Sequence, residues 1–137
     1  IKRELKKLKG KRIAVWGLSF KPNTDDIREA PSVTIIQELL KEGATVTACD
    51  PVAEKEARKI FGDKVSYHRD KYNCLKNADA LLIVTEWSQF KSPDFVKMRN
   101  FMKTPIIFDG RNIYSLEQMK DSGFTYVSIG RAKVSPR

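Results

Sequence analysis

The sequence is poor in the residues that usually build metal and redox sites, with one histidine and two cysteines among 137 residues. Cys49 and Cys74 are widely separated and form no CxxC pair, which disfavours a structural zinc site. Both are therefore expected to be reduced, small apolar residues of a cytoplasmic protein. The longest apolar run, residues 80–84, is far too short to span a bilayer. The basic first residues are not followed by an apolar segment, so we expect no signal peptide and no membrane association.

Groups that carry catalysis are also scarce. His68 stands beside Arg69 and has no plausible triad in the sequence, so it is expected at the surface. Neither cysteine has an obvious activating base. Carboxylate pairs of the kind found in glycosidases or metal sites are not evident. We therefore predict no catalytic group and no metal site in this chain.

The net charge of +9 is high enough to suggest a nucleic acid or an anionic membrane as a partner. The excess lies at the two ends, because residues 1–12 carry +6 and residues 131–137 carry +3. Residues 13–130 are neutral. The body of the protein is thus not basic, and we expect neither nucleic acid nor membrane as its partner.

Apolar, β-branched runs alternate with amphipathic segments along the chain. Strands are expected at residues 12–17, 45–49, 64–67, 80–85, 105–108 and 124–127, and helices at residues 31–40, 54–61, 70–77, 94–102 and 115–121. This alternation indicates βαβ units and a parallel sheet covered on both faces. The predicted fold class is α/β, a three-layer Rossmann-like domain with a mainly parallel sheet.

The two ends differ from this body. Residues 1–10 have helical spacing that Gly10 interrupts, and we interpret them as the end of a connecting helix or linker. Residues 11–131 form the predicted domain and residues 132–137 a tail. Because the chain begins at Ile1 without an initiator methionine, we expect it to be a piece of a longer protein.

The longest polar loop, residues 18–30, follows the first expected strand. Ligands of such sheets bind at the carboxyl ends of the strands, and loops of this length tend to be functional. Phe20 and Lys21 come directly after the strand, and an aromatic face beside an ammonium group suits a base and a phosphate. Asp26 and Arg28 are more typical of a scaffold that holds the loop through hydrogen bonds and an ion pair.

A second candidate loop, residues 108–114, follows the fifth expected strand. Gly110 permits a positive φ or a close backbone approach. Arg111 would then project from the same edge as Lys21, and two cations at one edge predict an anion site that an arginine can grip bidentately. The alternative is an ion pair between Arg111 and Asp109 at the surface.

Two further residues lie at strand ends. Asp50 occupies the place of the ribose-binding acid of dinucleotide folds, but the first turn has Gly17 and no GxGxxG. We therefore expect no standard NAD site in this chain and interpret Asp50 as the start of a helix. Trp87 is expected to pack in the core or at its rim, with the lining of a pocket or a contact to a partner domain as the alternative.

Taken together, these motifs resemble the C-terminal domain of the UDP-glucose/GDP-mannose dehydrogenase family. The resemblance is carried by GLSFKPNTDDIREAPS at residues 17–32, TEW at 85–87 with Phe90, FDGRNIY at 108–114, GFTY at 123–126 and IGR at 129–131. The FKPNTDD and DGRN segments are most similar to the branch that oxidises UDP-glucose to UDP-glucuronate. Branches that oxidise UDP-N-acetylhexosamines or GDP-mannose share much of the pattern and remain alternatives.

The resemblance implies an enzyme of three parts: an N-terminal Rossmann domain that binds NAD, a central helical segment that forms the dimer, and this nucleotide-sugar-binding domain. The catalytic cysteine, which carries a thioester during the two-step oxidation, is implied to lie in a motif that precedes this chain. The isolated fragment is accordingly expected to be inactive. The implied whole protein is a cytoplasmic homo-oligomer of polysaccharide biosynthesis.

The resemblance also assigns site residues. Phe20, Lys21 and Arg111 match the positions that contact the bound nucleotide sugar. The possible scaffold of the site comprises Gly17, Asp26, Arg28, Trp87 and Gly110. Two other hypotheses remain open, namely a free-standing nucleotide- or nucleic-acid-binding module that uses the basic ends, and a domain with only an assembly role.

Overall fold

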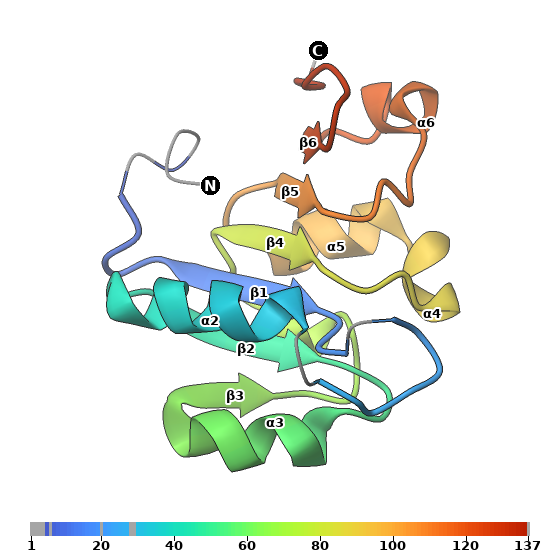
Figure 1. The fold of residues 1–137 in the computed structure, drawn as a ribbon. Coiled ribbons are helices and arrows are strands. Elements are labelled where there is room, and N and C mark those ends of the chain that lie inside the picture. Colours follow the sequence, from blue (N-terminus) through green and yellow to red (C-terminus); the bar gives the residue numbers. More distant parts are fainter. Residues whose placement is uncertain (1–4, 6, 20, 28–29, 137) are drawn as a thin grey trace.

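The computed structural model describes residues 5, 7–19, 21–27 and 30–136. Its strands are β1 (Arg12–Trp16), β2 (Thr45–Cys49), β3 (Val65–Tyr67), β4 (Ala80–Ile83), β5 (Ile106–Asp109) and β6 (Thr125–Ser128). They form one sheet in the order β3-β2-β1-β4-β5-β6, and every neighbouring pair is parallel (Figure 1). The predicted α/β, Rossmann-like architecture is confirmed.

Helices cover both faces of the sheet, as expected for a parallel sheet. On one side lie α2 (Pro31–Lys41) and α3 (Glu54–Phe61), and on the other lie α4 (Ser88–Lys91), α5 (Phe95–Phe101) and α6 (Leu116–Lys120) (Figure 1). Side chains of β1 alternate between the two resulting cores. Ile13 and Val15 join the core under α2 and α3, whereas Ala14 and Trp16 join the other core.

The predicted helix over residues 70–77 is wrong. Only a single 3-10 turn, η2 (Asn73–Leu75), forms in this segment, and another, η1 (Gly62–Lys64), precedes β3. The Asp70 carboxylate accepts hydrogen bonds from the backbone N–H groups of residues 72 and 73, which starts a turn. Asn77 has a φ of 60°, which leaves the right-handed helical path. The four-residue helix α4 was not predicted, because it is too short to show a hydrophobic period.

The strand order places a topological switch point between β1 and β4. The chain leaves β1 through α2 on one face and leaves β4 through α4 and α5 on the other. The loops after these two strands therefore diverge at the carboxyl edge. In open α/β sheets the crevice at such a switch point is where ligands bind. Gly17 and Thr85 stand at this point.

Near the two ends, single residues pack on the body. Leu8 is buried in the core under α2, and Val134 is buried against the opposite core and forms an isolated antiparallel bridge with Tyr126.

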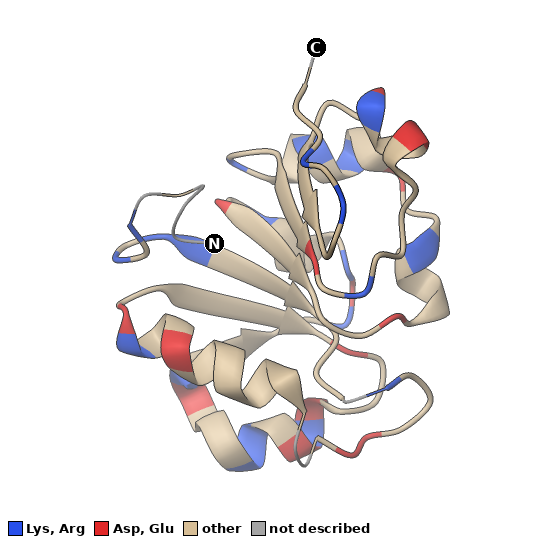
Figure 2. Cartoon of the chain, turned by 45° about the horizontal axis from the view of Figure 1, so that its top comes forward, with Lys and Arg blue, Asp and Glu red and all other residues tan. Residues whose placement is uncertain are grey.

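Charged residues lie mainly on helix surfaces and loops, and the central strands carry few of them (Figure 2). No helix within the described part of the chain is both long and apolar enough to cross a membrane.

Candidate functional site

The crevice begins at Gly17, directly after β1. Its φ is +97°, and a Cβ placed on it would lie 2.5 Å from the Cβ and 2.6 Å from the backbone nitrogen of Thr85. No side chain fits in this space, so glycine permits the ends of β1 and β4 to stay in contact. Gly17 thus holds the ends of β1 and β4 together, and its role as scaffold of a binding site stays a prediction.

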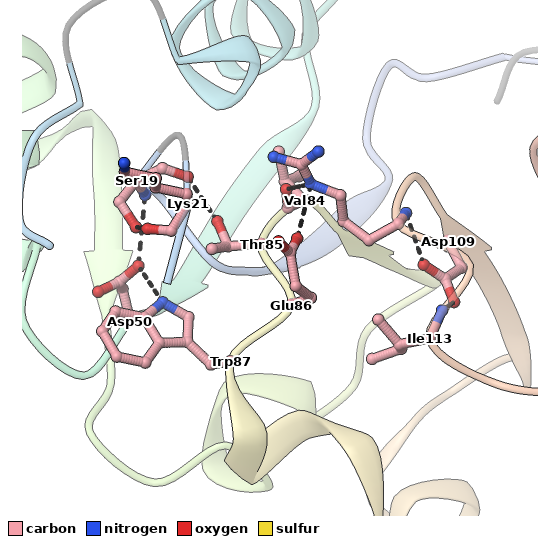
Figure 3. Close-up of polar contacts among 10 residues, drawn as sticks. Ser19, Lys21, Asp50, Val84, Thr85, Glu86, Trp87, Asp109 and Ile113 are labelled. Carbon is pink, nitrogen blue, oxygen red and sulfur yellow. Dashed lines mark hydrogen bonds and ion pairs between the residues drawn. The ribbon is translucent and has the colours of Figure 1, made fainter. Parts of the chain in front are cut away.

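The loop after Gly17 is anchored through hydroxyl groups. The Thr85 hydroxyl donates to the carbonyl of Ser19 over 2.6 Å, and the Ser19 hydroxyl donates to the carbonyl of Lys21 over 2.8 Å. A third hydroxyl, of Ser32, donates to the carbonyl of Leu18. These hydrogen bonds hold the carbonyls of Leu18, Ser19 and Lys21, and Lys21 itself is exposed (Figure 3). The sequence reasoning missed these three hydroxyls.

Asp50 joins the loops around the crevice. Its Oδ2 accepts hydrogen bonds from the backbone N–H groups of Leu18 and Ser19 and from the indole N–H of Trp87, over 2.8, 3.4 and 3.2 Å. Its Oδ1 accepts from the backbone N–H groups of residues 52 and 53, just before α3. A carboxylate engaged by five donors does not match the acid that holds a ribose. With no GxGxxG in the first turn, these residues do not fit NAD.

Trp87 is only 9% exposed and packs in the core on the α4 side of the sheet. Its indole N–H contact with Asp50 links the end of β4 to the end of β2. The expectation of core or rim packing is confirmed. Trp87 supports the crevice through Asp50.

Arg111 reaches the same crevice from β5. Gly110 makes the close backbone approach that was one of its two predicted uses, because a Cβ placed on it would lie 3.2 Å from the carbonyl oxygen of Ile83. Its N–H donates to that same carbonyl over 2.9 Å. The Nε of Arg111 lies 3.0 Å from the carbonyl oxygen of Val84 and 2.9 Å from Oε2 of Glu86. The guanidinium therefore lies at the end of β4.

Asp109, proposed above as a surface partner of Arg111, is instead only 2% exposed. It accepts hydrogen bonds from the backbone N–H groups of Arg111 and Ile113 and from the hydroxyl of Tyr126. The residue therefore organises the loop from within the fold.

Both candidate loops thus meet at the end of β4. Thr85 holds the loop of Lys21 through Ser19, and the next residue, Glu86, pairs with Arg111. Phe20 and Arg28 lie outside the described residues. In the loop that follows Lys21, the backbone N–H of Asp26 donates to the Thr24 hydroxyl, which is one of the local hydrogen bonds expected of a self-supporting scaffold.

A cavity of about 360 Å³ opens at the same edge, beyond the ends of β2 and β3. It is lined by Asp50, Pro51, Val52, Glu54, Lys55, Arg69 and Gln89. Asp50 borders this cavity and also accepts hydrogen bonds from the loops after β1 and β4, so the cavity lies beside the switch point. The candidate site therefore continues from the β1–β4 junction towards β3.

The site is suited to binding an anion and not to nucleophilic chemistry. Burial raises the pKa of both Cys49 and Cys74 to about 12, so the thiolate is not formed at neutral pH. Within the described residues, no group of three or more histidine, cysteine or acidic side chains is placed to hold a metal ion. Arg111 lies at the end of β4, the carbonyl of Lys21 is held by Ser19, and the cations Lys55 and Arg69 line the neighbouring cavity.

Comparisons with known proteins agree on one family. Residues 14–116 match the profile of the UDP-glucose/GDP-mannose dehydrogenase family, UDP binding domain. The UDP-glucose 6-dehydrogenase of Bacillus subtilis (strain 168) is 47% identical over 127 residues, which make up 93% of this chain and 28% of that protein.

Solved structures of nucleotide-sugar dehydrogenases also resemble this chain. A UDP-glucose dehydrogenase from Pyrobaculum islandicum has a TM-score of 0.72 at 36% identity, covering 82% of this chain and 24% of that one. A UDP-D-ManNAc dehydrogenase from Pyrococcus horikoshii has a TM-score of 0.75 at 29% identity, covering 95% and 28%. The chain spans less than a third of the length of each of these relatives.

Proposed function

The chain belongs to the UDP-glucose/GDP-mannose dehydrogenase family, and on this basis we propose that it holds the diphosphate of UDP-glucose for an NAD-dependent UDP-glucose 6-dehydrogenase. The observation that carries the proposal is the anchoring of both candidate loops to the end of β4. Thr85 fixes the loop of Lys21 and Glu86 pairs with Arg111. A diphosphate carries the negative charge that two convergent cations recognise.

The contribution of this domain to the reaction is orientation. Arg111 and Lys21 grip the diphosphate, and Phe20 is the third contact proposed from the family resemblance. The hydrogen bonds to the carbonyl of Lys21 and from the backbone N–H of Arg111 hold these two residues in place before the ligand arrives. Holding the nucleotide in one position directs the sugar C6 towards the reacting groups, and positioning of this kind lowers a barrier by several kcal/mol, on the order of 7–11 in the best cases.

The remaining parts of the proposal concern the longer protein. NAD, which accepts hydride in such oxidations, would be bound by an N-terminal domain, since the turn at Gly17 does not suit it. The catalytic cysteine would lie in a motif that precedes this chain, since neither Cys49 nor Cys74 suits that role. Residues 1–10 would end the connecting helix, residues 11–131 form the binding domain and residues 132–137 the tail. We further propose a cytoplasmic homo-oligomer that serves polysaccharide biosynthesis.

The test replaces Lys21 or Arg111 by alanine in the full-length protein. Lys59→Ala and Arg58→Ala are matched controls, because both side chains are exposed on α3 and pair with glutamates of the same helix. We expect kcat/KM for UDP-glucose to fall at least about tenfold, the loss of roughly 1.4 kcal/mol of binding, in the site variants only. An Arg111→Ala enzyme with unchanged kcat/KM would overturn the assignment.

A second candidate substrate is a UDP-N-acetylhexosamine. It is favoured by the likeness to the UDP-D-ManNAc dehydrogenase of known structure, whose TM-score of 0.75 is as high as that of the UDP-glucose enzyme. Comparing kcat/KM for UDP-glucose, UDP-N-acetylmannosamine and GDP-mannose separates these possibilities. Titration with a random oligonucleotide tests the module hypothesis, since tight and salt-sensitive binding without a response to UDP would favour it.

A further inference from the structure

A buried hydrogen-bond network lies behind the loop that carries Arg111. Its centre is Asp109, whose Oδ1 accepts from the backbone N–H of Arg111 over 2.8 Å. Its Oδ2 accepts from the backbone N–H of Ile113, also over 2.8 Å. The carboxylate thus holds the backbone on both sides of residue 112, and it is buried with the loop wrapped around it.

Tyr126 on β6 completes the coordination of this carboxylate. Its hydroxyl donates to Asp109 Oδ2 over 2.6 Å, and the residue is fully buried. Asp109 ends β5 and lies beside β6, so the hydroxyl reaches it across the strand pair. Burial raises the pKa of Tyr126, and so do the hydrogen bond to Asp109 and its negative charge, so the phenol stays protonated as a donor.

Arg131 connects the network to the segment after β6. Its Nη2 donates to the Tyr126 hydroxyl over 2.8 Å, and its Nη1 donates to the carbonyl of Tyr114 over 2.9 Å. Its Nε donates to the hydroxyl of Ser128 over 2.9 Å. The planar guanidinium therefore spans the last residue of β6, the phenol of Tyr126 and the end of the Arg111 loop.

A second clamp acts at the tip of the loop. Asn112 has a φ of 53°, a left-handed conformation that asparagine tolerates better than most residues. Its side-chain amide donates to the carbonyl of Ile129 and accepts from the backbone N–H of the same residue, both over 2.9 Å. The loop is thus tied to the segment after β6 on either side of the buried carboxylate.

From these contacts we infer that Tyr126, Asp109 and Arg131 are positioning residues that set the place of the Arg111 guanidinium for the diphosphate. The inference rests on the proposed function, because it assigns this network to the same site. The network contacts the backbone of residues 111–114, and in the proposed site the ligand is contacted by the Arg111 side chain. Loosening it should weaken binding of the diphosphate and affect the chemical step much less.

The experiment uses Tyr126→Phe in the full-length protein, which removes one hydroxyl and keeps the ring. Tyr67→Phe is the matched control, since its hydroxyl is also buried but has no hydrogen-bond partner among the described residues. We expect KM for UDP-glucose and the Kd of UDP to rise about fivefold to tenfold in Tyr126→Phe, with kcat changed less than about twofold. Hydrogen exchange of peptides covering residues 109–114 should also become faster. Tyr67→Phe should change none of these.

The outcomes separate the two proposals. If the wild-type protein binds no UDP, the proposed function fails, while hydrogen exchange still reports on the clamp. If UDP binds and Tyr126→Phe leaves its Kd unchanged, the positioning inference is overturned, whatever the exchange shows. Should Tyr126→Phe not fold, Arg131→Lys serves instead, because it keeps the charge and cannot span the same three partners. An unchanged KM and Kd in that variant would also overturn the inference.

Discussion

Thr85 fills the space at the carboxyl edge of the sheet that a side chain on Gly17 would need, since a Cβ on Gly17 would lie 2.5 Å from the Thr85 Cβ. Their closeness keeps the ends of β1 and β4 together, and the hydroxyl of Thr85 is thereby placed to hold the carbonyl of Ser19. Because residue 17 has no side chain, Thr85 can come close enough to hold the loop that leads to Lys21.

The first prediction is that Gly17→Ala destabilises the protein. The new methyl group collides with side-chain and backbone atoms of Thr85, and alanine is strained at a φ of +97°. Overpacking and strain together should lower the free energy of unfolding by at least about 2 kcal/mol. Gly10→Ala is the control for strain alone, because its φ is +79° but nothing lies within 4 Å. Equal urea midpoints for the two variants would contradict the prediction.

The second prediction concerns Asp50. Replacing it by alanine leaves the buried N–H groups of Leu18, Ala53 and the Trp87 indole without their acceptor. At about 1–3 kcal/mol for each unsatisfied group, the loss of stability should exceed about 3 kcal/mol. Urea denaturation measures it, and Asp63→Ala, at an exposed position in η1, is the control. A loss no larger than that of the control would show that Asp50 does not hold the loops.

Much of the fold follows from pattern alone. Alternation of buried strands such as residues 80–83 with amphipathic helices such as α2 predicts a parallel sheet, and Gly43 after α2 marks a helix end. The helix predicted for residues 70–77 was wrong, although the polar and apolar residues of this segment have helical spacing. A local Asp70 turn and the left-handed Asn77 override that spacing.

Some features of the candidate site could likewise be predicted from the sequence, and others could not. The place of Lys21 and Arg111 at the carboxyl edge could be predicted, because residues that follow the strands of a parallel sheet gather at one edge. Their contact with a ligand stays a prediction. The supporting contacts could not be predicted, since Thr85 with Ser19 and Tyr126 with Asp109 are far apart in the sequence. Their hydroxyls become recognisable only when the strand order β1-β4-β5-β6 is known.

The third prediction is that the protein loses stability at alkaline pH. Burial raises the pKa of the Cys49 and Cys74 thiols from 9.0 to about 12. Their contribution to stability is complete below pH 9, where both folded and unfolded thiols are protonated. It is lost as the pH rises from 9 towards 12, because only the unfolded chain releases the protons. The slope is at most about 1.4 kcal/mol per pH unit for each thiol.

Urea denaturation at several pH values measures this effect. The variant in which both cysteines are replaced by alanine should show a flatter dependence between pH 9 and 10. The tyrosines, whose pKa is also raised by burial, act only above their ordinary value of 10.0. A wild-type midpoint that stays constant up to pH 11 would contradict the prediction.

The fourth prediction is that binding to the crevice depends on salt through the diphosphate. Lys21 is exposed and the Arg111 side chain is 31% exposed, so salt screens the attraction of both cations for an anion. In the full-length protein, the Kd of UDP should rise about tenfold between about 0.05 M and about 0.5 M NaCl. Uridine lacks the phosphates and should show no such rise. Lys21→Ala should reduce the salt dependence, whereas Lys59→Ala should preserve it. Equal salt dependence for UDP and uridine would mean that these cations do not face the diphosphate.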